Sequence, residues 1–185
     1  MTGIRDTAVG IAEEVRAALT RVDEAQAEGF AQAVLDARRI VVAGVGREGL
    51  AARAFTMRLG HAGLDAHWVW DDTAPPVLDG DLLVVVSGSG RIAHLEAVAT
   101  GARAAGATTA VVTAAPSGVT AQLADHLLVV PAAAYLAYTA VETVQPMGSQ
   151  FEQAVLVLLD AIVLRIVEAR GLAFADLAQR HRNIE

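Results

Sequence analysis

Apolar residues occur in short runs along this chain, and stretches with helical periodicity separate the runs. The runs predict five strands near residues 39–43, 66–70, 82–86, 108–113 and 126–130, and the stretches between them predict helices near 49–62, 92–105 and 118–124. Runs such as Leu82–Val86 are continuously apolar rather than alternating, which is typical of parallel strands that helices cover on both faces. The pattern predicts an α/β fold, with a five-stranded parallel sheet flanked by helices in three αβα layers.

The segments on either side of this alternation are helical as well. Residues 5–37 predict N-terminal helices with a break at Gly29, and a helix from about 150 to 170 follows a proline-containing loop over 131–149. The chain shows no internal repeat and no linker. We therefore expect a single domain over residues 1–185, consisting of N-terminal helices (1–37), an αβα core (38–170) and a C-terminal tail (171–185).

The longest apolar segment, Ala154–Val167, does not fit a membrane span. It contains Asp160 and Arg165, and it is shorter than the roughly 20 apolar residues that a bilayer requires. Its apolar residues surround most of the helix, which indicates burial on more than one side. Because the domain is small, we expect a second subunit to cover this helix, in a homodimer or homotetramer.

Composition and charge narrow the range of partners. The 185 residues carry a net charge of −7 and no block of basic residues, which argues against nucleic acid and anionic lipid as partners. The chain has no cysteine and therefore neither a disulfide nor a thiolate nucleophile. Residues 1–6 lack the apolar region of a signal peptide, so we expect a cytoplasmic protein.

Two glycine-rich loops follow predicted strands, namely Gly44-Val45-Gly46-Arg47-Glu48-Gly49 and Ser87-Gly88-Ser89-Gly90. A strand that runs into such a turn before a helix directs backbone N–H groups and the positive end of the helix at one point, which favours an anion. The two serine hydroxyls favour a compact phosphate over a long dinucleotide. We predict a sugar-phosphate site that includes Gly46, Arg47, Ser87, Gly88, Ser89 and Arg91.

Two other interpretations of the loops are weaker. Gly44-x-Gly-x-x-Gly matches the dinucleotide fingerprint, and Asp71 or Asp72 could bind a ribose, but a lone motif of this kind is weak. A nucleophilic serine is not indicated, because neither Ser87 nor Ser89 lies in a Gly-x-Ser-x-Gly motif.

Several motifs occur in one order along the chain: Gly-x-Gly-Arg after the first strand, Met57-Arg58-Leu59 with His61, Ser87-Gly88-Ser89-Gly90, Gln145-Pro146-Met147-Gly148-Ser149-x-Phe151-Glu152-Gln153, and Arg180-His181-x-Asn183-Ile184-Glu185. From about residue 40 onward this order resembles the 6-phospho-3-hexuloisomerases, a family of the sugar isomerase (SIS) domain superfamily. The resemblance implies conversion of 3-hexulose 6-phosphate to fructose 6-phosphate by an oligomer with sites near subunit interfaces. It also implies that Thr73, which follows Asp72 and precedes Pro75, lies in a sugar-binding loop.

An isomerisation through an enediol needs a base for the carbon-bound proton and a group that moves hydroxyl protons, but no metal or redox cofactor. The resemblance implies that Glu152 is the base. The residues alone favour another role, because Ser149-Gln150-Phe151-Glu152 has the form of a capping box at the start of a helix.

His61 is the residue that the resemblance implies for the hydroxyl protons, and an imidazole can exchange protons near neutral pH. A histidine at a helix end also serves as a cap or a surface residue. His181, in the tail motif, is expected to contribute to the site of a neighbouring subunit, unless the terminus is frayed. His67, His94 and His126 carry weaker signals, and no histidine spacing indicates a metal site.

The loops depart from the family pattern at three positions. Glu48 stands where the family has a small hydroxyl residue, and Arg91-Ile92 replaces an acidic residue followed by threonine. A carboxylate about 4 Å from a phosphate would be repelled by roughly 4 kcal/mol per unit charge at the effective dielectric of a protein surface. We therefore expect an ion pair between Glu48 and Arg91, unless both are solvated and the phosphate site is lost.

These observations lead to one expected function and two alternatives. The expected function is isomerisation of 3-hexulose 6-phosphate and fructose 6-phosphate through an enediol, without a cofactor. The alternatives are isomerisation of another phosphosugar, such as a pentose or heptose phosphate, and a non-catalytic sensor of sugar phosphates with the same fold.

Overall fold

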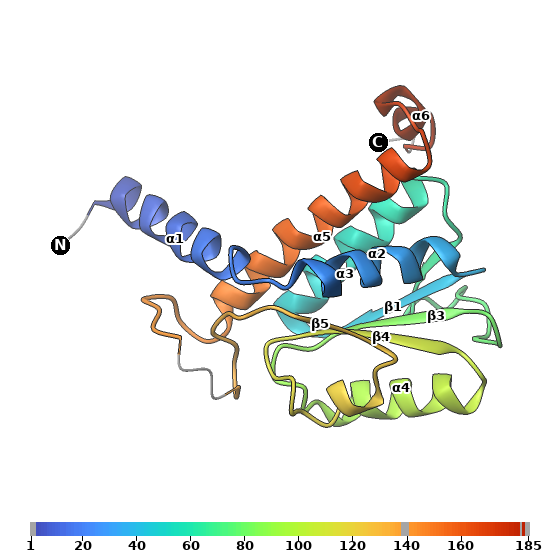
Figure 1. The fold of residues 1–185 in the computed structure, drawn as a ribbon, viewed down its shortest axis with the longest axis horizontal. Helices are drawn as coiled ribbons and strands as arrows, with labels where there is room; N and C mark the ends of the chain where they lie inside the picture. The colour runs from blue at the N-terminus through green and yellow to red at the C-terminus, as the bar shows by residue number, and fades with distance from the viewer. Residues whose placement is uncertain (1–2, 138–140, 182, 184–185) are drawn as a thin grey trace.

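Five parallel strands form the centre of the protein, in the spatial order β2-β1-β3-β4-β5 (Figure 1). The structure is a computed structural model, and it describes residues 3–137, 141–181 and 183. The strands are β1 (Ile40–Gly44), β2 (Ala66–Trp68), β3 (Leu82–Val86), β4 (Thr108–Thr113) and β5 (His126–Val129). The predicted five-stranded parallel sheet is confirmed.

Helices cover both faces of the sheet. They are α1 (Ile4–Leu19), α2 (Glu24–Asp36), α3 (Gly46–His61), α4 (Ala93–Ala104), α5 (Ser149–Ala169) and α6 (Phe174–Gln179), with a 3₁₀ turn η1 (Ala121–Leu123) before β5. Helices α2, α3 and α5 lie on one face and α4 on the other, and α1 projects from the body of the molecule (Figure 1). The three-layer αβα arrangement is therefore also confirmed.

The alternation of side chains along β1 supplies both layers of the core. Ile40 and Val42 pack in the cluster that contains Phe55 of α3, whereas Val41 and Ala43 pack in the cluster that contains Leu95 of α4. Every residue of β1 and β3 is buried. This explains why the strand sequences are continuously apolar rather than alternating.

Two predictions about helices are wrong. Gly29 lies inside α2 and does not break a helix, because the break occurs earlier, where the side chain of Asp23 accepts a hydrogen bond from Gln26 N and caps α2. The segment 118–124 forms only the short turn η1 rather than a helix. In addition, α3 begins at Gly46, three residues before the predicted start, so most of the first glycine-rich loop is the first turn of a helix.

The described residues between β5 and α5, 131–137 and 141–148, are here called the strap, and they are anchored to α1. Glu14 of α1 accepts hydrogen bonds from Thr143 Oγ1 (2.5 Å), Val144 N (3.0 Å) and Gln145 Nε2 (2.9 Å). The bond from Thr143 is the main cause that lowers the pKa of Glu14, and the bonds from the other two residues act in the same direction. Glu14 is therefore an ionised acceptor at neutral pH that ties the strap to α1.

Candidate functional site

The two glycine-rich loops lie side by side at the carboxyl edge of the sheet, because β1 and β3 are neighbours with Gly44 opposite Val86. This edge is where open α/β sheets bind ligands. The first loop turns sharply at Gly46, whose φ is +58°. Gly49 packs so closely on Gly44 that an added Cβ would lie 2.8 Å from Gly44 C, and only glycine fits there.

A cavity of about 280 Å³ opens between these loops, the strap and the start of α5. Among the residues that line it are four of the predicted site residues and Glu152, namely Gly46, Arg47, Ser89, Arg91 and Glu152. Glu48 also lines the cavity. The structure therefore gathers residues from three separate segments of the sequence around one space.

Glu152 lies in the first turn of α5 and forms an ion pair with Arg47. Arg47 Nε donates to Glu152 Oε2 at 2.5 Å, and the Glu152 side chain is 17% exposed. The capping-box interpretation is wrong, because Gly148 is the N-cap and no side chain caps this helix end. The carboxylate of Glu152 turns instead to the guanidinium, since a charge-assisted hydrogen bond is stronger than a bond to a backbone N–H.

Glu48 contacts the serine loop rather than Arg91. Its Oε2 accepts a hydrogen bond from Gly88 N at 2.8 Å, and the ion pairs among the described residues do not include one between Glu48 and Arg91. The expected exchange of charges is therefore wrong. Burial raises the pKa of Glu48 to about 7, with Glu152 acting in the same direction and the Gly88 bond opposing both.

The serine loop is tightly packed. Ser87 is buried, and its hydroxyl has no hydrogen-bond partner among the described residues. A Cβ added at Gly88 would lie 2.9 Å from both Ala134 Cβ and Phe151 Cδ1, so this position accepts only glycine. Ser89 Oγ accepts from Arg91 N at 3.3 Å. Of these residues, Ser89 and Arg91 line the cavity, while Ser87 and Gly88 form its buried support.

Thr73 lies outside the lining of this cavity. Its N and Oγ1 both donate to Asp71 Oδ1, at 3.0 and 2.8 Å, so that the pair forms a compact turn. Trp70, just before this turn, donates from Nε1 to Gly44 O at 3.2 Å. The turn is thus attached to the edge of the first loop without reaching into the cavity.

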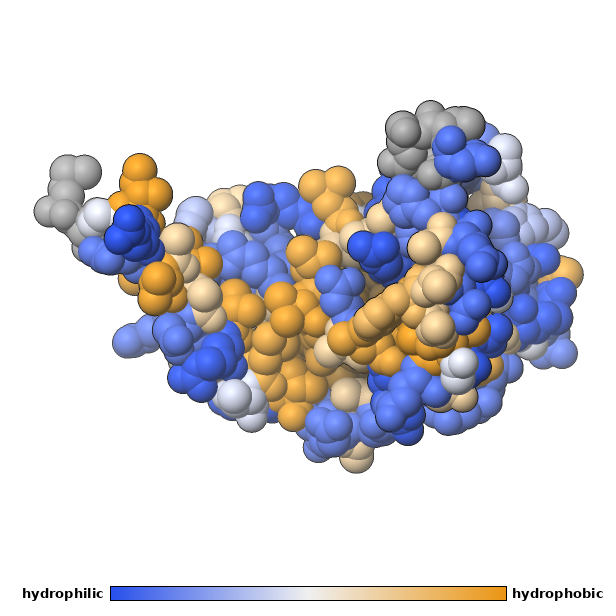
Figure 2. Space-filling model, turned by 90° about the horizontal axis from the view of Figure 1, so that it is seen from above, coloured by the Kyte–Doolittle hydropathy of each residue, from blue (hydrophilic) through white to orange (hydrophobic). Residues whose placement is uncertain are grey.

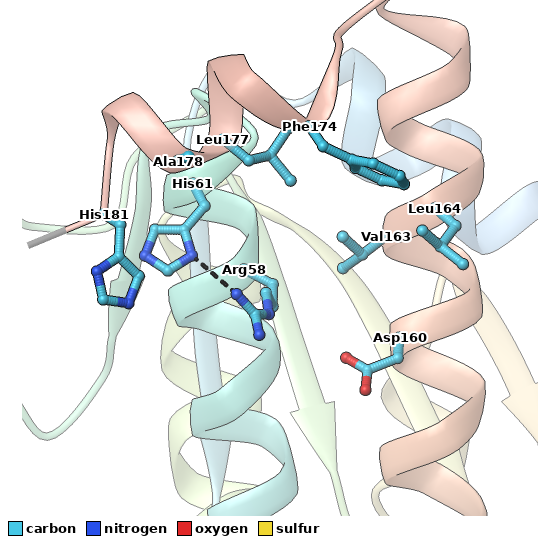
Figure 3. Close-up of a pocket in the computed structure, with 9 residues that line it drawn as sticks. All are labelled: Arg58, His61, Asp160, Val163, Leu164, Phe174, Leu177, Ala178 and His181. Carbon is cyan, nitrogen blue, oxygen red and sulfur yellow. Dashed lines mark hydrogen bonds between the residues drawn. The ribbon is translucent and has the colours of Figure 1, made fainter.

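His61 and His181 line a second cavity, of about 550 Å³, between α3, α5 and α6 (Figure 3). Their ring centroids are 5.2 Å apart, and Arg58 Nη1 lies 3.3 Å from His61 Nδ1. Because His61 ends the helix that Gly46 begins, it is about 22 Å along the axis from the first cavity. One chain therefore does not bring His61 and Glu152 together.

Part of the tail motif lies in the described residues. Arg180 Nη1 donates to His61 O at 3.4 Å and to Asp176 O at 3.0 Å, which attaches the tail to the end of α3. Positions 182, 184 and 185 of the motif lie outside the described residues.

The strap contributes cavity residues that the sequence analysis missed. Tyr135, Leu136 and Met147 all line the first cavity. Leu136 and Met147 have φ values of 59° and 60°, and within the described residues they are the non-glycine positions with positive φ. Such strained conformations cluster at functional sites. For Met147, the motif over residues 145–153 was a usable signal, whereas no sequence pattern marked Tyr135 or Leu136.

Within the described part of the chain, no cluster of three or more His, Cys, Asp or Glu residues could hold a metal ion. The helices of that part also include none with the length and apolarity needed to cross a membrane.

A serine- and glycine-rich loop thus lies at the carboxyl edge of a parallel αβα sheet, beside an ion-paired carboxylate. The chain belongs to the SIS domain family, whose model matches residues 33–157. Within it, the chain belongs with the 3-hexulose-6-phosphate isomerases. It is 34% identical over 176 residues to the enzyme of that name from Bacillus subtilis (strain 168), which covers 95% of both chains.

Two further similarities support this assignment. The chain is 35% identical over 175 residues to the 3-hexulose-6-phosphate isomerase of Mycobacterium gastri, covering 95% of this chain and 88% of that one. It also superposes on the crystal structure of a hypothetical protein from Methanococcus jannaschii, for which a 3-hexulose-6-phosphate isomerase function has been inferred. That superposition has a TM-score of 0.83 and 25% identity, and covers 97% of this chain and 99% of the other.

Proposed function

We propose that this protein interconverts 3-hexulose 6-phosphate and fructose 6-phosphate through an enediol intermediate. The observation that carries the proposal is the carboxylate of Glu152, which is held by Arg47 in a cavity beside the serine loop. A base next to an anion-binding loop can move a proton between neighbouring carbons of a phosphorylated ketose. The relatives named 3-hexulose-6-phosphate isomerase support the choice of substrate.

Glu152 acts as the base in this proposal. It takes the proton from C2 of the 3-hexulose, which leaves an enediol across C2 and C3, and returns a proton to C3. The hydroxyl proton on O2 is lost as the C2 carbonyl forms, and O3 gains one. The ion pair with Arg47 holds the carboxylate of Glu152 in place at the start of α5.

Arg47 and the serine loop hold the substrate. The Arg47 side chain is 64% exposed beside Glu152, so its remaining N–H groups can donate to the sugar oxygens that gain negative charge in the enediolate. Ser89, Arg91 and Gly88 N–H bind the phosphate, with Ser87 beneath them. The pocket volume of about 280 Å³ suits a ligand of this size.

His61 moves the hydroxyl protons from a second copy of the chain, because it lies too far from Glu152 within one copy. His181, which packs against His61, accompanies it into that site. The proposal therefore requires a homodimer or homotetramer, which we place in the cytoplasm. Thr73 contributes only if the turn that Asp71 holds moves toward the sugar.

Isotope exchange tests this function directly. Purified protein is incubated with fructose 6-phosphate in D₂O, and the sugar is analysed by NMR. Removal and return of the C3 proton by an enzymic base should place deuterium at C3, and Glu152→Gln should prevent this. Absence of labelling in the wild-type protein would contradict the proposal.

A non-catalytic sensor is the second candidate, and the position of Glu48 favours it, since a carboxylate occupies the N–H that a phosphate would use. A sensor would bind fructose 6-phosphate without introducing deuterium. An isomerase of a pentose or heptose phosphate would label its own substrate faster than fructose 6-phosphate in the same experiment.

A further inference from the structure

Glu48 occupies the position of an anion on the serine loop. Its side chain extends from the first turn of α3 to the loop after β3, where its Oε2 accepts from Gly88 N at 2.8 Å. Backbone N–H groups of glycine-rich turns are the donors that bind phosphate oxygens. The protein thus supplies a carboxylate of its own at a donor that an anionic ligand also needs.

Three other N–H groups at this loop donate hydrogen bonds within the protein. Ser87 N donates to Val112 O at 3.0 Å and Gly90 N donates to Ser87 O at 3.2 Å, while Arg91 N donates to Ser89 Oγ at 3.3 Å. Gly88 N–H differs from these three because its acceptor is an ionisable side chain, which can rotate away. A dianion that binds here must therefore compete with Glu48 for Gly88 N–H.

The charged groups around Glu48 determine the electrostatic free energy of binding a dianion at this position. From α5 it faces Glu152, which also carries a negative charge. Arg47 from its own helix is already paired with Glu152, and Arg91 and Tyr135 line the same cavity from the serine loop and the strap. A dianion added beside two ionised carboxylates would be strongly repelled, and neutralising Glu48 removes one of them. Burial places the pKa of Glu48 at about 7, so this neutralisation is accessible near neutral pH.

We propose that Glu48 couples anion binding at the serine loop to protonation: a dianion binds at Gly88 N–H only as the Glu48 carboxyl group takes up one proton from solvent. The neutral carboxyl then donates its O–H to the bound anion, so that Glu48 changes from a competitor into a ligand-binding residue. This inference rests on the proposed function only in assigning a sugar phosphate as the natural dianion.

Calorimetry with inorganic sulfate tests the coupling. Sulfate is a suitable probe because it does not titrate between pH 6 and pH 8, so that any proton taken up is bound by the protein. Titrations in two buffers with different ionisation enthalpies give the number of protons bound per sulfate. With a pKa of about 7 in the empty protein, we expect about 0.9 proton at pH 8 and about 0.1 at pH 6, with binding about tenfold weaker at pH 8.

Variants identify the group that takes up the proton. Glu48→Gln and Glu48→Ser should bind sulfate with no proton uptake and with an affinity that does not change between pH 6 and pH 8. Glu152→Gln and the exposed control Glu168→Gln should retain the uptake. Circular dichroism establishes that each variant is folded, and the two substitutions at Glu48 provide independent tests.

Four results would overturn the inference: no sulfate binding at pH 6, sulfate binding to the wild-type protein without proton uptake, uptake that persists in both Glu48 variants, or uptake that disappears in Glu152→Gln. The outcome is separate from that of the proposed function, because sulfate binding requires no turnover. Proton uptake without deuterium exchange into fructose 6-phosphate would refute the isomerase function and support the role of Glu48. Deuterium exchange without proton uptake would support the isomerase function and refute the role of Glu48.

Discussion

Two carboxylates of the cavity, Glu152 and Glu48, differ in the group that holds each of them. Glu152 forms an ion pair with a guanidinium, whereas Glu48 faces a backbone N–H in a partly buried position that favours its neutral form. Neighbouring acids in different surroundings can serve different roles in one reaction. In the proposed function Glu152 is accordingly the base, and Glu48 is the residue that we propose responds to the charge of the ligand.

Glu152→Gln should lower kcat at least about 100-fold, because it removes the base, and should leave the KM for fructose 6-phosphate nearly unchanged. Steady-state kinetics measure both constants. Glu168→Gln, on the same helix but at its opposite end, is the matched control and should behave as the wild-type protein. If Glu152→Gln retains turnover within about threefold of wild type, Glu152 only orients Arg47.

Glu48→Gln should stabilise the protein at pH 8 but not near pH 4.5. The pKa of Glu48 is raised from 4.5 to about 7 in the folded state, so the folded state binds more protons than the unfolded state between these values, and stability falls as the pH rises through this window. The shift corresponds to at most about 3 kcal/mol. Urea unfolding at several pH values should show that the difference in free energy of unfolding between variant and wild type grows toward that value as the pH rises. Parallel pH profiles of the two proteins would contradict the raised pKa of Glu48.

At the scale of elements, the sequence analysis correctly identified the five strands. The signal is strongest in β1 and β3, which are buried on both faces and therefore continuously apolar, whereas the edge strands β2 and β5 are only partly buried. It misplaced the break between α1 and α2, since Gly29 is tolerated within a helix and the true signal was the cap at Asp23. The contact between Glu48 and Gly88 joins two segments 40 residues apart and depends on how closely their loops pack. No local pattern encodes such a contact, nor the left-handed backbone of Leu136.

Gly88→Ala tests how tightly the serine loop packs against the strap and α5. The new methyl group would lie 2.9 Å from Ala134 and Phe151, so we expect a loss of about 1–3 kcal/mol in the free energy of unfolding. Gly29→Ala is the control, because nothing lies within 4 Å of its added Cβ inside α2, and it should stabilise the protein by about 0.5–1 kcal/mol. If the two substitutions have equal effects on stability, the serine loop can relax around the added methyl group. If Gly29→Ala destabilises the protein, the position of Gly29 inside α2 is contradicted.

The molecule as a whole leaves an apolar face uncovered. Figure 2 shows apolar side chains gathered across the face seen from above, between the α1 arm and the C-terminal end. Leu50 and Met57 of α3 and Leu156, Val157 and Leu164 of α5 are 40–68% exposed. Contiguous apolar surface of this kind marks an interaction site, and a second copy is the partner that the proposed role of His61 requires.

We therefore expect light scattering at micromolar concentration to give a mass of at least two chains. Leu164→Glu should shift the protein toward the monomer, because it places a charge in the apolar face of α5. Leu78→Glu should leave the mass unchanged, since Leu78 has a similar exposure but lies in the loop before β3. A monomeric wild-type protein would exclude a contribution of His61 or His181 from a neighbouring copy.

The arm formed by α1 is linked to the cavity through Glu14. This carboxylate holds Thr143, Val144 and Gln145 of the strap, and the strap forms the cavity wall that carries Tyr135, Leu136 and Met147. Gln150 adds a second link, because its Nε2 donates to Glu14 O at 3.1 Å and its Oε1 accepts from Ala133 N at 2.7 Å. The packing of the amino-terminal helix therefore helps to set the shape of the cavity, although α1 projects from the body of the molecule (Figure 1).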